Sequence, residues 1–343
     1  MYFLTTCAEG DLHQYFRSLG IESQGMAASS TFFPLVFMRR FFSLLRFCSK
    51  HHITVVHSHL HPTNIVAVFA QYFLKCKVFI FRHHLHHPDE SVQLNRNEKT
   101  FDRIISKLAK KIVVPSSGVR NGMVNQESVP ADKVVVIPYL YDFSHYNKPD
   151  PTAVGEIKSL YPCRLLLIMV SRLIKLKRHM AVFPVIKKLV DQGYDIKLLV
   201  LDDGDERSNL EQWINSNGMG QSVFLLGFKR DFINYMAASD LLLQPSLTDA
   251  SNNVAKEMAY LKKVIAVSDG VGDYSDYVVD GFNGFLLPLV SPETKIYEII
   301  RSVYADPHSF RIFGERLYQT VIEKFDVSNS DAVMECYERL HQS

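Results

Sequence analysis

Two acidic residues, Asp249 and Glu257, lie eight positions apart around a polar segment. That segment holds the residues that would begin a helix: Ser251, Asn252, Asn253 and Val254. Ser and Asn cap helices, and the free N–H groups of a helix N-terminus bind phosphate. Glu257, one turn into the helix, can accept two hydrogen bonds from a ribose cis-diol. Asp249 can reach the hydroxyls of a second ring. The pattern predicts a site for a sugar, a ribose and phosphates; a capping acid and a surface glutamate are the alternative.

Two cations follow the apolar segment 165–170, whose composition is typical of a strand buried on both faces. Arg172 and Lys177 would lie just past the carboxyl end of that strand, where parallel sheets bind ligands. A guanidinium and an ammonium there can hold a diphosphate and offset the charge that develops on it as a leaving group. A solvated basic loop is the alternative.

Two glycines end the strands expected next, Gly204 after 196–201 and Gly227 after 223–226. Glycine permits a tight turn close to a ligand. We therefore assign both to the predicted binding site, although most loop glycines only make turns.

Histidines collect after two strands expected in the first half of the chain. His57 and His59 end the first of these strands, and a further group follows the second: His83, His84, His86 and His87. Imidazoles are good metal ligands, so a metal site is one interpretation. No acidic residue stands at ligand spacing, however, and polar loop ends in a wet cleft would have the same composition.

Short apolar segments alternate with longer amphipathic ones, which predicts parallel sheets with helices on both faces. Strands are expected at 2–5, 54–57, 78–81, 112–115, 134–137, 165–170, 196–201, 223–226, 241–244, 264–266 and 285–287. Helices are expected at 62–75, 99–111, 179–192, 209–217 and 254–261. The proline-broken segment 147–151 is typical of a linker.

The predicted fold class is α/β, with two doubly wound domains that face a central cleft. We place the first domain at residues 1–145 and the second at 146–325. A C-terminal helix is expected within 326–343, packing back toward the first domain.

The composition is that of a globular protein, with 343 residues, 47% hydrophobic and 22% charged. A net charge of +2 is too balanced to indicate nucleic acid as a partner. The five cysteines are scattered without a CxxC pair, which predicts reduced thiols. No apolar run reaches the roughly 18 residues of a membrane span, and Met1 leads into a strand without a signal peptide. We therefore expect a cytoplasmic protein.

Three motifs in this order resemble those of the family 4 (group 1) glycosyltransferases, which have the GT-B fold. The segment Arg172-Leu173-x3-Lys177 is similar to the family's GRLxxxKG, and Asp249-x7-Glu257 is similar to its E-x7-E. A third segment, Asp280-Gly281-x-Asn283-Gly284, is similar to its DGxNG. The resemblance spans most of the chain and is strongest over 170–288.

This resemblance implies two Rossmann-like domains and a retaining transfer of a sugar from a nucleotide diphosphate sugar, without a cofactor or a bound metal. The acceptor would be a glycan or a lipid-linked glycan in surface polysaccharide or lipopolysaccharide assembly. Arg172 and Lys177 would hold the diphosphate, Glu257 the ribose and Asp249 the donor sugar. Backbone amides near 251–254 would meet the sugar and phosphates.

The same resemblance places the acceptor on the first domain. It also implies a functional histidine near the donor sugar, for which His83 is the best match and His84 the second.

The chain departs from the family pattern at four places. It begins at a segment that resembles the second strand, so the first strand–helix unit of the first domain is expected to be missing. Asp249 replaces a glutamate, which leaves the donor sugar open. Arg178 replaces a glycine and is expected to add a cation near the diphosphate. Tyr139 and Tyr141 lie in the segment that replaces the family's Pro-Asn-Gly-x-Asp hinge, and we expect them to stiffen the turn and stack on a ligand.

Residues 34–52 interleave Phe and Leu with Arg and Lys. This composition fits docking on an anionic bilayer. The alternative is a crossover helix whose apolar face packs on the sheet. We favour the crossover for the helix itself and expect its arginines to contact the inner face of a plasma membrane peripherally.

Two other functions fit the same residues. A sugar-nucleotide epimerase or hydrolase of related fold would need acid and base residues aimed at the sugar. A glycan-binding or partner subunit without activity is the third possibility. A Rossmann dehydrogenase is not expected, because no GxGxxG follows any strand.

Overall fold

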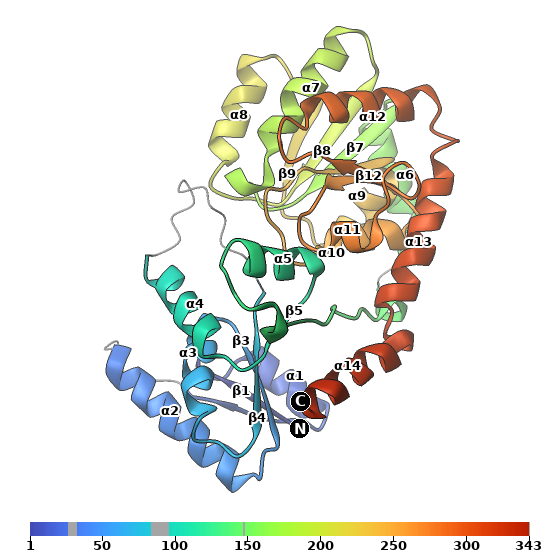
Figure 1. The fold of residues 1–343 in the computed structure, drawn as a ribbon. Helices are drawn as coiled ribbons and strands as arrows, with labels where there is room; N and C mark the ends of the chain where they lie inside the picture. Colours follow the sequence, from blue (N-terminus) through green and yellow to red (C-terminus); the bar gives the residue numbers. More distant parts are fainter. Residues whose placement is uncertain (27–32, 84–95, 147, 343) are drawn as a thin grey trace. The chain divides into compact units, whose positions relative to one another are not determined.

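The chain forms two α/β units in a computed structural model that describes residues 1–26, 33–83, 96–146 and 148–342 (Figure 1). Unit 1 comprises residues 1–115, 119–137 and 339–343, and unit 2 comprises 116–118 and 138–338.

The proline-containing segment at 147–151, predicted as a linker, lies within unit 2. Pro151 begins helix α6 (Pro151–Leu160), where Asp150 caps the helix by accepting a 2.9 Å hydrogen bond from the Thr152 amide. Proline is favoured there because the N–H it lacks would have no partner in the first turn of a helix.

Unit 1 contains two parallel sheets. Strands β1 (Tyr2–Thr5) and β2 (Glu22–Gly25) form the smaller sheet, and within the described residues they pair only with each other. The larger sheet has the order β3 (Val55–His59), β4 (Lys77–Phe81), β5 (Ile112–Val114) and β6 (Val134–Val136). The helical connections are α1 (Asp11–Ser18), α2 (Phe33–Lys50), α3 (His61–Ala70), α4 (Arg96–Leu108), α5 (Ser117–Asn125) and the 3-10 turn η1 (Ala131–Lys133).

Unit 2 contains one six-stranded parallel sheet in the order β12-β11-β10-β7-β8-β9. Its strands are β7 (Leu165–Val170), β8 (Ile196–Leu201), β9 (Val223–Gly227), β10 (Leu241–Gln244), β11 (Val264–Ser268) and β12 (Phe285–Leu287). Its other helical segments are η2 (Phe143–His145), η3 (Lys175–Lys177), α7 (His179–Asp191), α8 (Arg207–Ser216), α9 (Phe232–Ala238), α10 (Asn253–Tyr260), α11 (Tyr274–Tyr277), α12 (Glu293–Ala305), α13 (Arg311–Phe325), η4 (Val327–Asn329) and α14 (Ser330–Gln342). The last residues of α14 belong to unit 1, where the His341 ring stacks on Phe79.

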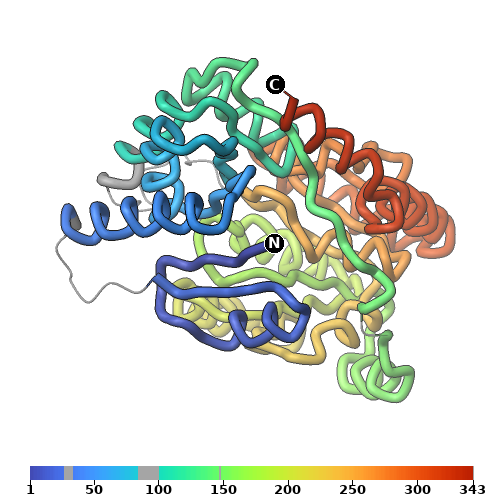
Figure 2. The backbone as a smooth tube through the Cα atoms, turned by 90° about the horizontal axis from the view of Figure 1, so that it is seen from below, coloured from blue at the N-terminus to red at the C-terminus, as the bar shows by residue number. Residues whose placement is uncertain are grey.

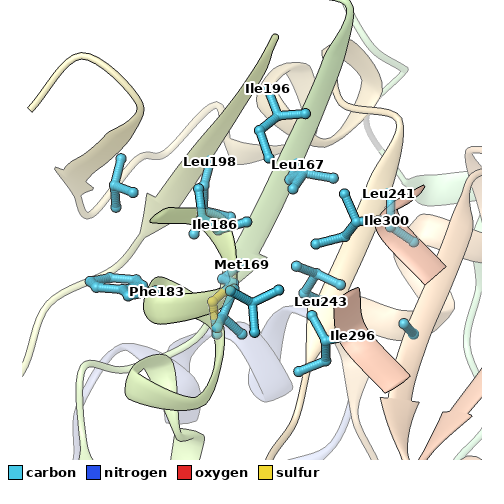
Figure 3. Packing of buried hydrophobic residues seen from close by; sticks show 14 of the residues in the cluster. Leu167, Met169, Phe183, Ile186, Ile196, Leu198, Leu241, Leu243, Ile296 and Ile300 are labelled. Carbon is cyan, nitrogen blue, oxygen red and sulfur yellow. The ribbon is translucent and has the colours of Figure 1, made fainter. Parts of the chain in front are cut away.

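Alternate residues of the central strand β7 enter two separate cores, because successive side chains of a strand point to opposite faces. Leu167 and Met169 pack with residues of α7 and α12, such as Phe183 and Ile296 (Figure 3). Ile168 packs on the other face with residues of α10 and α13. Each such aliphatic side chain contributes roughly 1.5–3 kcal/mol by its burial, which fixes the sheet between two helical layers.

The strand order reverses beside β7, since the chain leaves β7 for β8 and β9 on one side and returns to β10 on the other. Open parallel sheets bind ligands at the carboxyl ends of strands at such a reversal. The loops after β7 and β10 carry the predicted cations and acids, so the topology of unit 2 brings them to one place.

Candidate functional site

Lys177 and Asp249 meet at the carboxyl ends of β7 and β10. The Lys177 Nζ lies 2.9 Å from Asp249 Oδ2, and the two side chains are 15% and 16% exposed. The side-chain amide of Asn252 donates to the same oxygen at 2.8 Å, and the Ala250 N–H donates to Oδ1 at 2.9 Å. Burial alone would raise the pKa of Asp249, but Lys177 and these hydrogen bonds outweigh it and hold that pKa below its usual value. Asp249 is therefore an oriented, ionised carboxylate.

Asn252 links that carboxylate to the start of α10. Its Oδ1 accepts a 2.9 Å hydrogen bond from the Ala255 N–H, which makes it the N-cap of the helix. The same side chain donates to Asp249 through its other end. Because the cap engages only the third amide of the helix, the N–H groups of Asn253 and Val254 remain as first-turn donors. An anion at this helix end would meet two backbone donors beside Asp249.

Glu257 lies one turn further along α10 and is only 9% exposed. Burial raises the pKa of its carboxyl group to about 7. No described residue gives this carboxylate a hydrogen bond. A buried carboxylate without donors is costly, so this position favours a ligand that brings hydroxyl groups.

A buried ion pair holds the loop that precedes α10. Lys256 is fully buried, and its Nζ lies 2.5 Å from Asp273 Oδ2. Asp273 accepts a 2.6 Å hydrogen bond from Ser251 Oγ, and Lys256 donates to the Asn252 carbonyl at 3.2 Å. Burial lowers the pKa of Lys256, and the attraction of Asp273 opposes that shift. The pair therefore fixes the positions of Ser251 and Asn252 through hydrogen bonds to buried groups of unit 2.

Aromatic rings surround this ammonium. Those of Tyr141, Tyr277 and Phe325 have centroids 5.2, 5.2 and 4.8 Å from Nζ. Neither Lys256 nor Asp273 was predicted from the sequence as a site residue. Their separation of 17 residues matches no motif that would predict an ion pair. Only the flanking apolar residues of α10 indicate that Lys256 is buried.

The side chains of Ser251 and Asn253 form hydrogen bonds with other residues of unit 2. Ser251 binds Asp273, and Asn253 Oδ1 accepts a 2.8 Å hydrogen bond from the Tyr141 hydroxyl. The expectation that Tyr141 stacks on a ligand is wrong, because its ring is 9% exposed and stacks on Phe143 within the core. The backbone of Tyr141 is also fixed, since its N–H donates to the Phe325 carbonyl at 2.7 Å.

Arg178, which is expected to add a cation near the diphosphate, also has a structural role. It adopts a left-handed conformation, φ 53° and ψ 43°, directly before α7. Its guanidinium donates to the Leu289 carbonyl at 2.9 Å, so this cation has a structural partner. The positive φ explains why glycine suits the position.

Arg172 is exposed at the end of β7. Gly204, after β8, and Gly227, the last residue of β9, both have backbone roles. A Cβ on Gly204 would lie 2.5 Å from the Leu173 carbonyl oxygen, so only glycine lets these two loops touch. Gly227 has φ 69°, and its carbonyl accepts from the Asp202 N–H at 2.9 Å.

The DGxNG segment closes a turn. Asn283 is 1% exposed; its Oδ1 accepts from the Val279 N–H at 2.7 Å, and its Nδ2 donates to the Tyr277 carbonyl at 2.9 Å. A Cβ on Gly284 would lie 2.9 Å from Val278 Cγ1. This motif therefore shapes unit 2.

The histidines of unit 1 form a stacked group. His83 Nε2 lies 3.0 Å from His59 Nδ1, and the two rings stack at 5.2 Å. Burial lowers the pKa of His57 to about 4, with further contributions from His59 and His341, and burial also lowers the pKa of His59. His84 lies outside the described residues. Within residues 1–26, 33–83, 96–146 and 148–342, no group of three His, Cys, Asp or Glu side chains could hold a metal ion.

Two family models match the chain in succession. The model described as Glycosyltransferase Family 4 matches residues 4–144, and the model described as Glycosyl transferases group 1 matches residues 157–320. The chain belongs to the group 1 glycosyltransferases. Its two α/β units are those of the GT-B fold, as the sequence predicts.

Similar proteins agree with this assignment. An uncharacterised glycosyltransferase of Methanocaldococcus jannaschii is 27% identical over 87% of this chain and 77% of its own length. The N-acetyl-alpha-D-glucosaminyl L-malate synthase of Bacillus anthracis is 26% identical over 66% of this chain and 58% of its own. The crystal structure of Anabaena HepE in complex with UDP has a TM-score of 0.80 at 15% identity and covers 98% of this chain and 99% of its own.

None of the helices in the described part of the chain is long and apolar enough to span a bilayer.

Proposed function

We propose that this glycosyltransferase is a retaining, metal-independent enzyme that moves a sugar from a nucleotide diphosphate sugar to a glycan or lipid-linked acceptor in surface polysaccharide assembly. The observation that carries the proposal is the environment of Glu257. Its buried carboxylate lacks donors among the described residues and lies behind the helix end where an anion would bind. A nucleotide combines a cis-diol with phosphates and meets both requirements.

The other residues follow from this placement. The Lys177 ammonium has three donors and gives one to Asp249, so two remain for diphosphate oxygens. Arg172 adds a second cation at the end of β7. Both cations would offset the charge on the departing nucleotide diphosphate. Asp249, held by Lys177 and Asn252, would receive the hydroxyls of the donor sugar.

The similar proteins support a uridine nucleotide as donor. Anabaena HepE has been solved with UDP and with UDP-glucose. The names of the relatives point to different acceptors, since one is an N-acetyl-alpha-D-glucosaminyl L-malate synthase and another, from Saccharomyces cerevisiae, is a phosphatidylinositol N-acetylglucosaminyltransferase subunit. We therefore propose a UDP-sugar donor and place the acceptor on unit 1, with His83 near the transferred sugar.

Titration calorimetry with UDP at pH 8 tests the role of Glu257. Replacing the carboxylate in Glu257→Gln should weaken UDP binding roughly 10- to 100-fold, because charge-assisted hydrogen bonds contribute about 1.5–3 kcal/mol. The matched control is 2′,3′-dideoxy-UDP, which lacks the diol. It should bind both proteins with equal affinity. Equal affinity of the two proteins for UDP itself would contradict the assignment.

A further inference from the structure

Helices α2 and α3 of unit 1 expose large apolar side chains on one side. Leu35, Met38 and Phe42 follow the spacing of a helical face on α2 and are 60%, 45% and 58% exposed. Three more lie at the end of α3 and in the turn after it: Phe69, Tyr72 and Phe73, which are 37%, 56% and 71% exposed. These six residues define the α2–α3 surface.

Aromatic contacts join the two halves of this surface. Phe37 meets Phe69 edge to face at 5.6 Å between ring centroids. Phe41 contacts Phe42 and Phe73, each at 5.5 Å. Both views of the backbone show α2 along the outer side of unit 1, with α3 against it (Figures 1 and 2). Because Phe37 and Phe41 also stack at 6.1 Å, the exposed rings of Phe42, Phe69 and Phe73 belong to one aromatic cluster that joins α2 to the end of α3.

The stretch of sequence that contains this surface carries positive charge and no acidic residue. The sequence has no Asp or Glu between Glu22 and Asp89, an interval that at the chain's average would hold about seven. The same interval contains seven cations: Arg39, Arg40, Arg46, Lys50, Lys75, Lys77 and Arg82. Four of these are exposed on or directly after the two helices, namely Arg39, Arg46, Lys50 and Lys75. Lys110 adds a further ammonium 5.8 Å from the ring of Tyr72.

We propose that the α2–α3 surface docks this protein on an anionic lipid bilayer. Its Phe, Tyr, Leu and Met side chains would enter the boundary between headgroups and acyl chains, while the surrounding cations pair with anionic headgroups. The inference rests on the proposed function where it concerns the acceptor, since a bilayer would deliver a lipid-linked acceptor to the unit proposed to bind it.

The combination of groups distinguishes a bilayer from other partners. A second copy of the chain would bring the same cations face to face, with no carboxylate in the interval to pair with them. A polyanion such as a sulfated glycan would use the cations and leave Leu35 and Met38 without a partner. An anionic membrane uses both the apolar and the cationic groups.

Vesicle sedimentation of the full chain tests the proposal. Binding to vesicles of phosphatidylglycerol and phosphatidylcholine should exceed binding to pure phosphatidylcholine at least tenfold, and high salt should weaken it. The variant Phe42→Ser/Arg46→Gln should lower the partition coefficient about tenfold. The matched control is Phe228→Ser/Arg230→Gln, which makes the same substitutions at exposed positions of unit 2 and should bind vesicles like the unaltered protein.

Each of the following results would overturn the proposal: equal binding to both vesicle types, equal loss in both variants, or heparin binding without vesicle binding. A dimer that Phe42→Ser dissociates, with no vesicle binding, would assign the surface to a second copy instead. Titration of each protein with UDP separates this test from the proposed function. Vesicle binding without UDP binding would reject the nucleotide site and retain the membrane surface. UDP binding without vesicle binding would reject the membrane surface and retain the nucleotide site.

Discussion

The ionisation of Glu257 links its burial to measurable stability. Its carboxyl group has an ordinary pKa of 4.5, which burial raises to about 7 in the folded chain. Between these values the folded protein binds more protons than the unfolded chain. The free energy of unfolding therefore falls as the pH rises from about 4.5 to about 7, and this contribution is constant above that range.

Urea unfolding at several pH values measures this contribution. The Glu257→Gln variant has no group to titrate at this position. Its stability relative to the unaltered protein should increase across the pH window, by about 3 kcal/mol at most. Parallel pH profiles for the two proteins would show that the carboxyl group titrates normally.

Residue roles were only partly predictable from the sequence. The order and spacing of the three motifs that resemble the family selected Lys177, Asp249 and Glu257, and the structure brings the first two into contact. The sequence could not predict that Arg178 binds a backbone carbonyl 111 positions away or that Tyr141 is buried. Those roles depend on how separate loops meet, which local patterns do not encode.

At the scale of elements, the strands of unit 2 were the most predictable part of the fold. Strands β7, β8, β10 and β12 have the predicted bounds, because continuous apolar segments are buried on both faces of a parallel sheet. Strand β2 was missed. Its sequence, Glu-Ser-Gln-Gly, has neither apolar alternation nor β-branched residues, and it pairs only with β1 among the described strands.

The Lys256–Asp273 pair couples helix α10 to the loop before α11. Removing one member of a buried pair leaves the other charge unpaired, so Lys256→Met should cost about 3–5 kcal/mol of unfolding free energy. The double variant Lys256→Met/Asp273→Asn should lose less than the two single variants together, because it buries no unpaired charge. Urea unfolding of all four proteins measures this coupling, and additive losses would show that the two groups act independently.

The junction of η3 and α7 requires a left-handed residue. Arg178→Gly and Arg178→Ala both remove the hydrogen bond to Leu289, so they differ only in backbone preference. The free energy of unfolding of Arg178→Gly should exceed that of Arg178→Ala by about 1 kcal/mol, since a Cβ is disfavoured at this φ. Thermal unfolding of the two variants compares them directly. A more stable alanine variant would mean that this segment does not keep the left-handed conformation.

At the scale of the whole molecule, the chain has one tryptophan, Trp213, which lies in unit 2 and contacts Phe183 at 5.7 Å between ring centroids. Its fluorescence therefore reports on unit 2, whereas far-UV circular dichroism reports on both units. The residues proposed to bind the diphosphate, the ribose and the donor sugar also belong to unit 2, since Lys177, Asp249 and Glu257 all lie within 138–338.

UDP should consequently stabilise the two units unequally. At 100 times its dissociation constant, a ligand that binds only the folded state adds about 2.7 kcal/mol. The urea midpoint followed by Trp213 fluorescence should rise with UDP, while the part of the circular dichroism change that belongs to unit 1 should not move. Glu257→Gln is the control, because its fluorescence midpoint should respond little at the same UDP concentration. Coincident transitions that shift together would show that the two units unfold as one cooperative body and do not have separate stabilities.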